Sequence, residues 1–189
     1  MHPLITYLLH YIALPDHAAQ LVLDHTQPLR LLAGESFAEA GQVAQYIGFL
    51  SEGVVRVFSY NDAGDEVTMY FLDEGHFVVD LDSFTNRKPA ISHIQAVTDC
   101  SFVTISRASL NQLSDKIPGW NDAIRRITEG ALLEKVRLRS PLVAANATIR
   151  YQNFLRDLPA IARRVPLQYI ASYLGIAPQS LSRIRRQKL

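Results

Sequence analysis

A series of short apolar segments between residues 29 and 106 constrains the fold of this chain more than any other feature. The segments are rich in β-branched and aromatic side chains, which favour strands. They occupy 29–33, 46–50, 54–60, 66–72, 94–98 and 102–106. Glycines separate them at 34, 41, 53, 64 and 75. This spacing predicts an antiparallel β-sandwich or jelly roll, with a hairpin turn at 61–66.

Helical periodicity replaces the strand pattern on both sides of this region. Before it, residues 3–12 and 16–25 predict two short helices. After it, residues 107–115 predict a third, and a longer helix is expected over 120–139, ended by Ser140-Pro141. The rest of the chain is expected to be all-helical, so the fold class is α+β. The predicted domains are a sandwich with its N-terminal helices (1–117), a long helix (118–140) and an all-α domain (141–189).

The long helix carries two apolar strips. One follows an a/d-like spacing, and we assign a dimer contact to its residues Ile124, Ile127, Ala131 and Leu138. The second strip comprises Leu132, Leu133 and Val136. A helix that is apolar on two sides needs two partners, so we expect its own domain on one side and a second copy of the chain on the other. The alternative is a helix buried entirely within its own domain.

Charge is divided unevenly along the chain. Residues 1–140 carry 11 Lys/Arg and 17 Asp/Glu, a net charge of −6, whereas residues 141–189 carry 8 Lys/Arg and only Asp157, a net charge of +7. This asymmetry suggests an anionic partner for the C-terminal segment. The alternative is a basic domain that merely balances an acidic one.

Composition narrows the compartment and the chemistry. Hydrophobic residues make up 48% of the chain, enough for a real core. The single cysteine, Cys100, excludes an internal disulfide, and we expect it to be a packed core thiol. The N-terminus lacks a basic leader with a small-residue cleavage site, and no apolar run approaches the roughly 18 residues of a membrane span. We therefore expect a cytoplasmic protein with no membrane association.

The C-terminal sequence LQYIASYLGIAPQSLSRIRRQKL predicts a helix-turn-helix. Gly175 suits the position after a first helix, and Pro178 suits the first turn of a second. In that second helix Leu181 and Ile184 face inward, whereas Arg183 faces outward. An outward arginine can bind guanine through both guanidinium arms. We assign DNA contacts to Gln179, Ser180 and Arg183 at base edges and to Arg185, Arg186 and Lys188 at phosphates.

The order of these parts resembles the Crp/Fnr superfamily of bacterial transcription regulators. The run YIASYLGIAPQSLSRIR is similar to that family's helix-turn-helix signature, and AGE (33–35), EG (52–53) and DEGHFVVDL (73–81) follow its cyclic nucleotide-binding-like sandwich. The chain ends where the family's usual β-hairpin wing would begin, so it is most similar to the short wingless regulators. The resemblance implies a homodimer joined by the long helix, a double-stranded DNA partner, an RNA polymerase contact and an effector of unknown identity.

The ligand cassette departs from the family pattern. Where cyclic-nucleotide binders carry G-x-x-F-G-E, this chain has Gly75, then Val79 and Asp80. Ala90 and Ile91 fall where an Arg-Ser pair would neutralise the cyclic phosphate, followed by Ser92. A buried phosphate would lack its bidentate counter-charge, and Arg87 and Lys88 are expected on a turn. We keep Gly75, Val79, Asp80, Ala90, Ile91 and Ser92 as pocket candidates and expect neither cyclic AMP nor any other cofactor.

Other chemistry is poorly supported. The six histidines form no H-x-H or H-E-x-x-H pair, so we predict no metal site, and we assign no catalytic residues. His76 and His93 are candidates to approach each other across the cassette. Asp80 and Asp82 are spaced to share one side of a strand, with a solvated or capping role favoured over catalysis. The alternative to a DNA-binding regulator is a ligand-sensing or protein-interaction module that binds no DNA; an enzyme ranks last.

Overall fold

Two four-stranded antiparallel sheets form the centre of the molecule. The computed structural model describes residues 1–186, apart from the side chains of residues 141, 143 and 144. One sheet has the order β1-β8-β3-β6 and the other β2-β7-β4-β5. The strands are β1 (Gln27–Leu31), β2 (Ser36–Ala38), β3 (Tyr46–Glu52), β4 (Val55–Tyr60), β5 (Glu66–Leu72), β6 (Phe77–Val78), β7 (His93–Ala96) and β8 (Cys100–Ser106). This arrangement confirms the expected antiparallel sandwich.

Apolar side chains of the two sheets meet in a core that includes Leu50, Val55, Ile94 and Phe102. The Cys100 thiol is buried in the same core, as expected. The β4–β5 connection is the predicted hairpin turn, with Gly64 at φ 84°. Strands β2 and β6 were not predicted, because segments of three and two residues are too short to show a periodic pattern.

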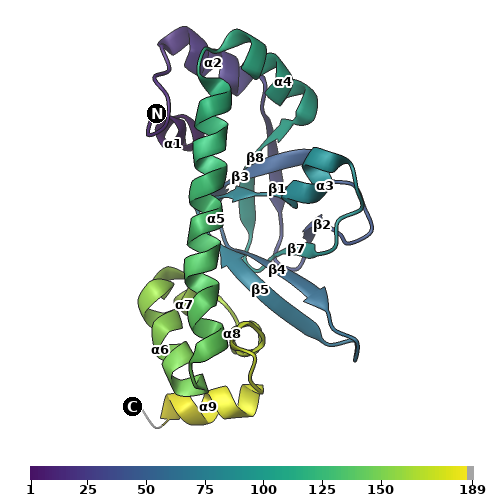
Figure 1. Cartoon of the computed structure of the whole chain (residues 1–189), viewed down its shortest axis with the longest axis vertical. Coiled ribbons are helices and arrows are strands. Elements are labelled where there is room, and N and C mark those ends of the chain that lie inside the picture. Colours follow the sequence, from purple (N-terminus) through teal and green to yellow (C-terminus); the bar gives the residue numbers. More distant parts are fainter. Residues whose placement is uncertain (187–189) are drawn as a thin grey trace.

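Helices cover the upper end of the sandwich and one side of it (Figure 1). Helices α1 (Pro3–Leu8), α2 (Asp16–Asp24) and α4 (Arg107–Lys116) lie at the upper end, and α5 (Trp120–Ala144) runs the length of the molecule. Trp120, Ala123 and Ile127 of α5 are buried, and Trp120 and Ile127 join the core formed with the N-terminal helices. The described helices include none whose length and apolar character would let it cross a bilayer.

The expected end of the long helix at Ser140-Pro141 is wrong. Helix α5 continues to Ala144 and has 25 residues. A proline inside a helix removes one backbone hydrogen bond. The 25-residue helix tolerates that loss, and the break comes instead at residues 145 and 146, before Asn146 caps the next helix through the Ile149 N–H at 3.0 Å.

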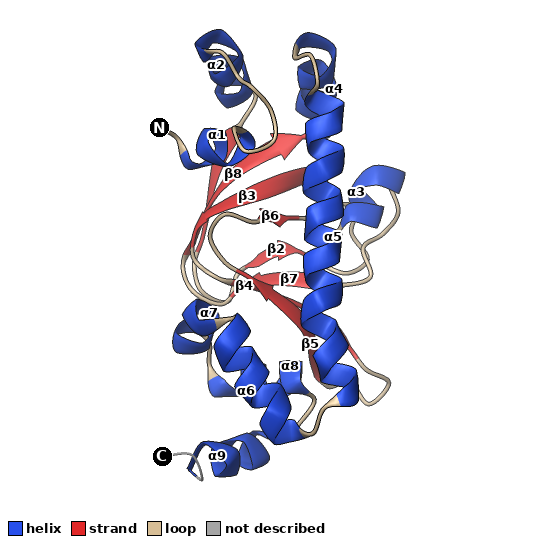
Figure 2. Cartoon of the chain, turned by 60° about the vertical axis from the view of Figure 1, so that its left-hand side comes forward, coloured by secondary structure: helices blue, strands red, loops and turns tan. Residues whose placement is uncertain are grey.

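The C-terminal part is helical in its described residues, as expected. It contains α6 (Ala147–Asp157), α7 (Pro159–Arg164), α8 (Leu167–Leu174) and α9 (Pro178–Arg186). Their shared core includes Tyr151, Phe154, Ile161, Leu174 and Leu181, and two sandwich residues, Val54 and Phe71, belong to it as well. The helices therefore pack on the sandwich rather than hanging free of it (Figure 2).

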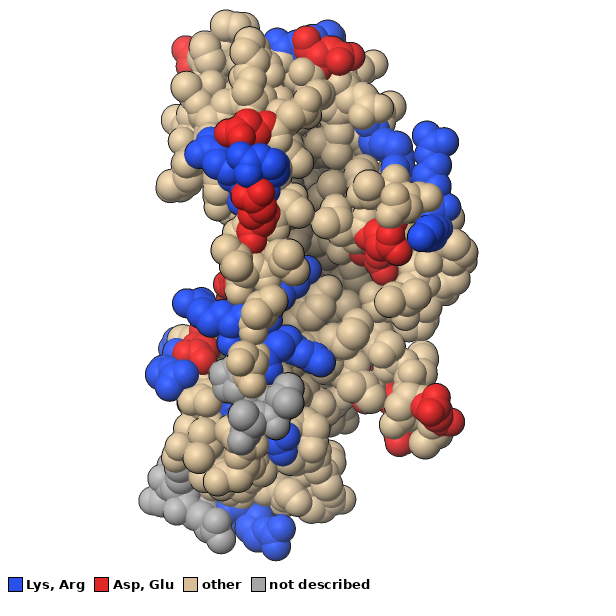
Figure 3. All heavy atoms as spheres, in the orientation of Figure 1, with Lys and Arg blue, Asp and Glu red and all other residues tan. Residues whose placement is uncertain are grey.

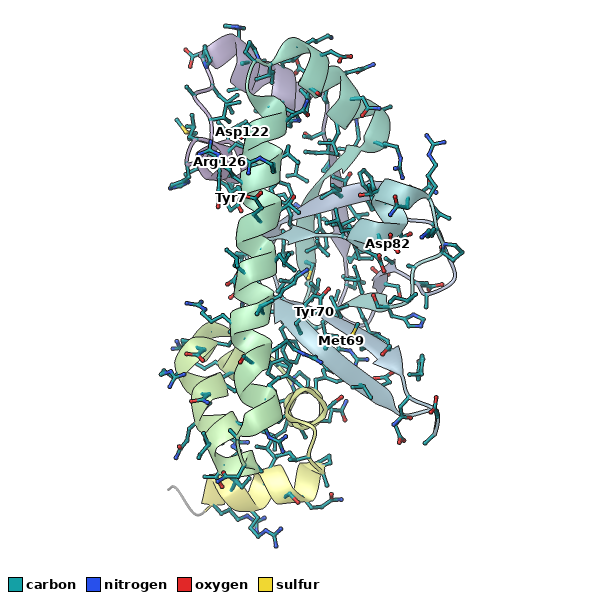
Figure 4. All side chains as sticks on the ribbon, in the orientation of Figure 1. Tyr7, Met69, Tyr70, Asp82, Asp122 and Arg126 are labelled. Carbon is teal, nitrogen blue, oxygen red and sulfur yellow. The ribbon has the colours of Figure 1, made fainter. Side chains whose placement is uncertain are left out.

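The placement of Asp80 and Asp82 on a strand is wrong. Asp80 is the N-cap of a short helix, α3 (Leu81–Asn86), and accepts a hydrogen bond from the Ser83 N–H at 3.1 Å. Asp82 lies in the first turn of α3, on the side of the molecule away from α5 (Figure 4). Aspartates are favoured at these positions because they satisfy unpaired backbone donors.

Candidate functional site

Helices α8 and α9 are joined by the tight turn that the sequence predicts. Helix α8 ends at Gly175, whose φ of 63° lies in the left-handed region. The Gly175 N–H donates to the Ser172 carbonyl at 3.1 Å, and the Ile176 N–H donates to the Ala171 carbonyl at 3.0 Å. These bonds satisfy carbonyls that a helix end leaves unpaired. The turn thereby fixes the angle between the two helices.

Buried side chains hold α9 in place. Leu181 is fully buried, and it packs with Ala171 and Leu174 of α8. Ile184 packs against the same core at its margin. Because these residues take up one side of α9, its polar residues are left on the other side.

The outward side of α9 carries the predicted DNA contacts. Gln179, Arg183, Arg185 and Arg186 are exposed and Ser180 is half-buried. Helix α9 lies at the lower end of the molecule, remote from α1 and α2, and Figure 3 shows Lys and Arg side chains at that end. The remaining predicted contact, Lys188, lies outside the described residues.

The acidic residue of this region does not oppose α9. Asp157 lies at the end of α6, where both its carboxylate oxygens accept from Arg156, at 2.8 and 3.0 Å. The Arg156 hydrogen bond lowers the pKa of Asp157. The positive charge of the exposed side of α9 is therefore not neutralised by this carboxylate.

The structure brings only some cassette candidates together. Asp80 accepts a hydrogen bond from the Ser92 hydroxyl at 3.4 Å, and Ser92 is buried. Ala90 is also buried, and its backbone is paired in both directions with the loop at Gly41 and Gln42. Ile91, by contrast, is 86% exposed and points away from the others. The polar atoms of Asp80 and Ser92 and the backbone of Ala90 are therefore paired within the chain.

Two cavities are shared by the cassette and α5, one of about 310 Å³ lined by Gly75 and one of about 200 Å³ lined by Val79. The cavity that Asp80 lines is small. It measures about 80 Å³, and of the six candidates only Val79 and Asp80 line it. Gly75 lies in the preceding turn, where its N–H donates to the Leu50 carbonyl at 2.9 Å. Pockets for drug-sized ligands measure about 300–1,000 Å³. The cavity that Asp80 lines falls well short of that range.

Cationic side chains near the cassette point outward. Arg87 is exposed and ends α3 in the left-handed conformation, with φ 56°. Lys88 is also exposed, while its backbone carbonyl accepts from the Ser83 hydroxyl at 2.6 Å. Neither residue offers a buried counter-charge for a phosphate.

The two histidines considered as a pair have separate partners. His93 stacks on Phe58, with ring centroids 5.0 Å apart. His76 lies in the β5–β6 turn, where its Nδ1 is 3.1 Å from the Asp73 carboxylate and its Nε2 is 3.6 Å from that of Glu134 on α5. The hydrogen bond with Asp73 raises the pKa of His76 to about 8. Sequence spacing could not reveal the Glu134 contact, because the two residues are far apart along the chain.

A larger cavity, of about 310 Å³, lies where α5 passes the β5–β6 turn. Its walls come from α1, β5, α5 and the C-terminal helices, and include Tyr7, His76, Glu134, Leu138 and Tyr173. Tyr70 also lines it, between β5 and α5, with the Lys135 ammonium 4.6 Å from its ring centre (Figure 4). No sequence motif marked this cavity, because its lining extends from residue 7 to residue 173.

The assigned dimer residues occupy different environments on α5. Ile127 is buried in its own domain and Ile124 packs against the same core. Ala131 is exposed, and Leu138 is half-buried beside the larger cavity. Among the described side chains of α5, the large apolar residues that are exposed are those of the second strip: Leu132 (62%), Leu133 (70%) and Val136 (59%).

Comparisons with known proteins find a matching family and similar solved structures for this architecture. Residues 28–116 match the cyclic nucleotide-binding domain family. No curated protein sequence matches the chain. Several solved structures are similar over most of the chain.

Three of these structures illustrate the likeness. The c-di-GMP responsive global regulator CLP of Xanthomonas campestris has a TM-score of 0.74 and 21% identity, over 92% of this chain and 91% of that one. FixK2 of Bradyrhizobium japonicum has a TM-score of 0.73 and 18% identity, over 86% and 83%. The catabolite activator protein of Thermus thermophilus has a TM-score of 0.55 and 19% identity, over 96% and 85%. The chain therefore has the Crp/Fnr fold.

Proposed function

We propose that this protein is a homodimeric, DNA-binding transcription regulator of the Crp/Fnr type. The observation that carries the proposal is the outward side of α9, where three described arginines are exposed at one end of the molecule. A helix held on its inner side by a turn and a small core, with arginines outward, suits the major groove of DNA. The family likeness supports the same function.

The residues of α9 divide by role. Arg183 reads a guanine edge through its two guanidinium arms, and Gln179 reads an adenine edge. Ser180, which donates and accepts, makes a less selective contact. Arg185, Arg186 and Lys188 bind phosphates, which contribute affinity without sequence preference.

The dimer we propose forms along α5. Its exposed strip of Leu132, Leu133 and Val136 is apolar, and burying it against a second copy would remove that surface from water. A two-fold axis along α5 places both α9 helices at the same end of the dimer. Two such helices suit half-sites about 34 Å apart, one turn of DNA.

The cassette makes cyclic nucleotides poor effectors. The buried Ala90 and the exposed Ile91 provide no cationic side chain for a cyclic phosphate. Any effector would act by binding the two states of the dimer with different affinities. A contact with RNA polymerase rests on the family likeness alone.

The test is duplex binding by the purified protein, measured by fluorescence anisotropy on fragments of its own promoter. Three phosphate contacts per protomer, or about six per dimer, predict a slope of about −5 for log affinity against log salt. The matched comparison is Arg30→Ala on β1, in the sandwich, which should leave binding unchanged. Failure to bind any duplex would reject the proposal in favour of a ligand-sensing or protein-interaction module.

A further inference from the structure

The C-terminal helices share a core with strand β5 of the sandwich. Phe71 of β5 is buried, and its ring centre lies 5.5 Å from that of Tyr173 on α8 and 6.3 Å from that of Phe154 on α6. Phe154 and Tyr173 are themselves 5.5 Å apart, which closes a triangle of aromatic rings. Figures 1 and 2 both show α8 beside β5. Apolar packing brings the two parts together but fixes their mutual orientation only loosely.

A buried arginine gives this interface a specific geometry. Arg56 of β4 is only 2% exposed, and its guanidinium lies between two rings, 4.0 Å from the centre of Phe58 and 3.8 Å from that of Tyr169 on α8. Its Nη2 is 2.6 Å from the Glu66 carboxylate, and its Nε donates to Gln95 at 2.9 Å. Burying a guanidinium is costly unless its partners are well placed. Tyr169 covers one side of this charge, so the position of α8 is tied to it.

A serine of α8 completes the edge of the sheet. Strand β5 is an edge strand, whose backbone groups need partners other than a further strand. The Ser172 hydroxyl accepts from the Thr68 N–H at 2.9 Å and donates to the Glu66 carbonyl at 2.8 Å. These two bonds fix α8 in register along β5.

A third contact comes from α7. Arg164 makes a bidentate pair with Glu74 of the β5–β6 turn, at 2.6 and 2.8 Å. Glu74 also accepts from the Gly53 N–H at 2.8 Å, which anchors it to the sandwich. A side chain at Gly53 would collide with the Asp99 carbonyl, 2.5 Å from the added carbon, and φ there is 107°. The carboxylate is therefore held on a rigid support.

These contacts join three helices of the C-terminal part, α6, α7 and α8, to the sandwich. Two residues, 145 and 146, connect α5 to α6, and a connection of that kind limits distance but leaves rotation open. We propose that Arg56, with Tyr169, Ser172 and the Arg164–Glu74 pair, forms a docking lock that sets the orientation of α9. This inference rests on the proposed DNA-binding function. In the dimer the lock determines which half-site spacing the two α9 helices fit.

The test separates orientation from contact. An operator is first selected from random-sequence duplexes. Affinity is then measured for three kinds of duplex: the two half-sites at the selected spacing, the two half-sites with the spacing changed by one or two base pairs, and a single half-site. Arg56→Met should reduce the wild-type preference for the selected spacing by about tenfold, while single half-site affinity stays within about twofold. A merely structural defect would lower both together.

The chain offers a matched control. Arg107 of α4 also stacks on an aromatic ring, with its guanidinium 4.5 Å from Phe84 of α3, and it donates to the Thr85 carbonyl, so its contacts lie on the sandwich side. Arg107→Met should leave spacing preference unchanged. Ser172→Ala is a second, milder variant, which keeps the core intact and should relax spacing preference in the same direction as Arg56→Met.

Hydrogen exchange supplies a readout that needs no DNA. The Thr68 amide should exchange faster in Ser172→Ala and in Arg56→Met than in Arg107→Met, because its acceptor on α8 is lost or displaced. Unchanged spacing preference in the two lock variants would overturn the docking lock. Absence of duplex binding by the wild type would instead overturn the proposed function, and with it the role of the lock in positioning α9 on DNA. The exchange rate of the Thr68 amide would still report whether α8 packs on β5.

Discussion

The cassette around residues 75–92 and the outward side of α9 both carry polar residues that the resemblance to the Crp/Fnr superfamily makes candidates for recognition. In the cassette those residues serve the fold: Asp80 caps α3, Ser92 donates to Asp80, and Ser83 donates to the Lys88 carbonyl. On α9 an inner row of apolar residues takes the packing role, and the arginines stay exposed. Polar groups already paired within the chain are poor ligands for anything else, because a new partner must displace the old one.

The difference also shows what the sandwich contributes. Outside the cassette, two of its charged side chains have partners at the boundary with the C-terminal helices: Arg56 pairs with Glu66 and stacks on Tyr169, and Glu74 binds Gly53 and Arg164. The Arg164 hydrogen bond lowers the pKa of Glu74 to about 2, so that pair stays charged throughout the neutral range. The sandwich thus contributes paired charges to its contact with α7 and α8.

The largest expected effect is on DNA binding by Arg183→Ala. Loss of a bidentate base contact should cost about 1–3 kcal/mol, roughly 5- to 150-fold in affinity, and relax selectivity at one base position. The matched change in the cassette is Arg87→Ala, an exposed arginine, which should leave affinity within about twofold. Anisotropy titrations on the same duplex check both. Equal losses of DNA affinity in the two variants would contradict the proposed difference between α9 and the cassette.

A smaller effect is expected on stability from Asp80→Ala. If Asp80 serves the fold, loss of its N-cap should lower the free energy of unfolding by about 0.5–2 kcal/mol, or about 2–4 °C in melting temperature per kcal/mol. Asp115→Ala, at an exposed site on α4, is the control and should change little. Thermal melts measure both variants. An unchanged melting temperature for Asp80→Ala would return this carboxylate to the list of ligand contacts.

The contrast between local and distant signals explains what the sequence could predict. The sandwich, the α8–α9 turn and the inward position of Leu181 were predictable. Their signals, glycine spacing and helical periodicity, are read from residues close together in the sequence. Strand β6 and helix α3 were not, because a two-residue strand and a six-residue helix leave too few positions for periodicity. Pro141 was a misleading stop signal, since α5 continues past it.

The site follows the same rule. The outward residues of α9 belong to one helix, so their shared side could be assigned from spacing alone. The contact of Thr68 with Ser172 joins residues 104 positions apart, and nothing in either segment marks the other. The burial of Arg56 between rings of two domains likewise arises only when the chain folds.

A modest pH dependence of stability is expected from His76, in the turn that precedes the cassette. Its pKa rises from 6.5 to about 8 on folding, mainly through Asp73, so the stability it contributes is fully present below pH 6.5 and is lost as pH rises through 8. Solvent screening at a side chain one-third exposed limits the effect to about 1 kcal/mol. Urea unfolding at pH 6 and pH 8.5 should show this loss in the wild type and a flatter response in His76→Gln. The same slope in both proteins would assign the dependence to other groups.

The smallest expected effect, none at all, is that of cyclic AMP or cyclic GMP on melting temperature. A ligand at 100 times its Kd stabilises a protein by about 2.7 kcal/mol, which would raise the melting temperature of a chain this size by about 5–11 °C. No such rise is expected, because the phosphate would meet Ala90 where a buried cation is needed. Adenosine 5′-monophosphate at the same concentration controls for weak general binding. A saturable rise with the cyclic nucleotides alone would show that the cassette opens to admit them, and that its inward hydrogen bonds are exchangeable rather than part of the fold.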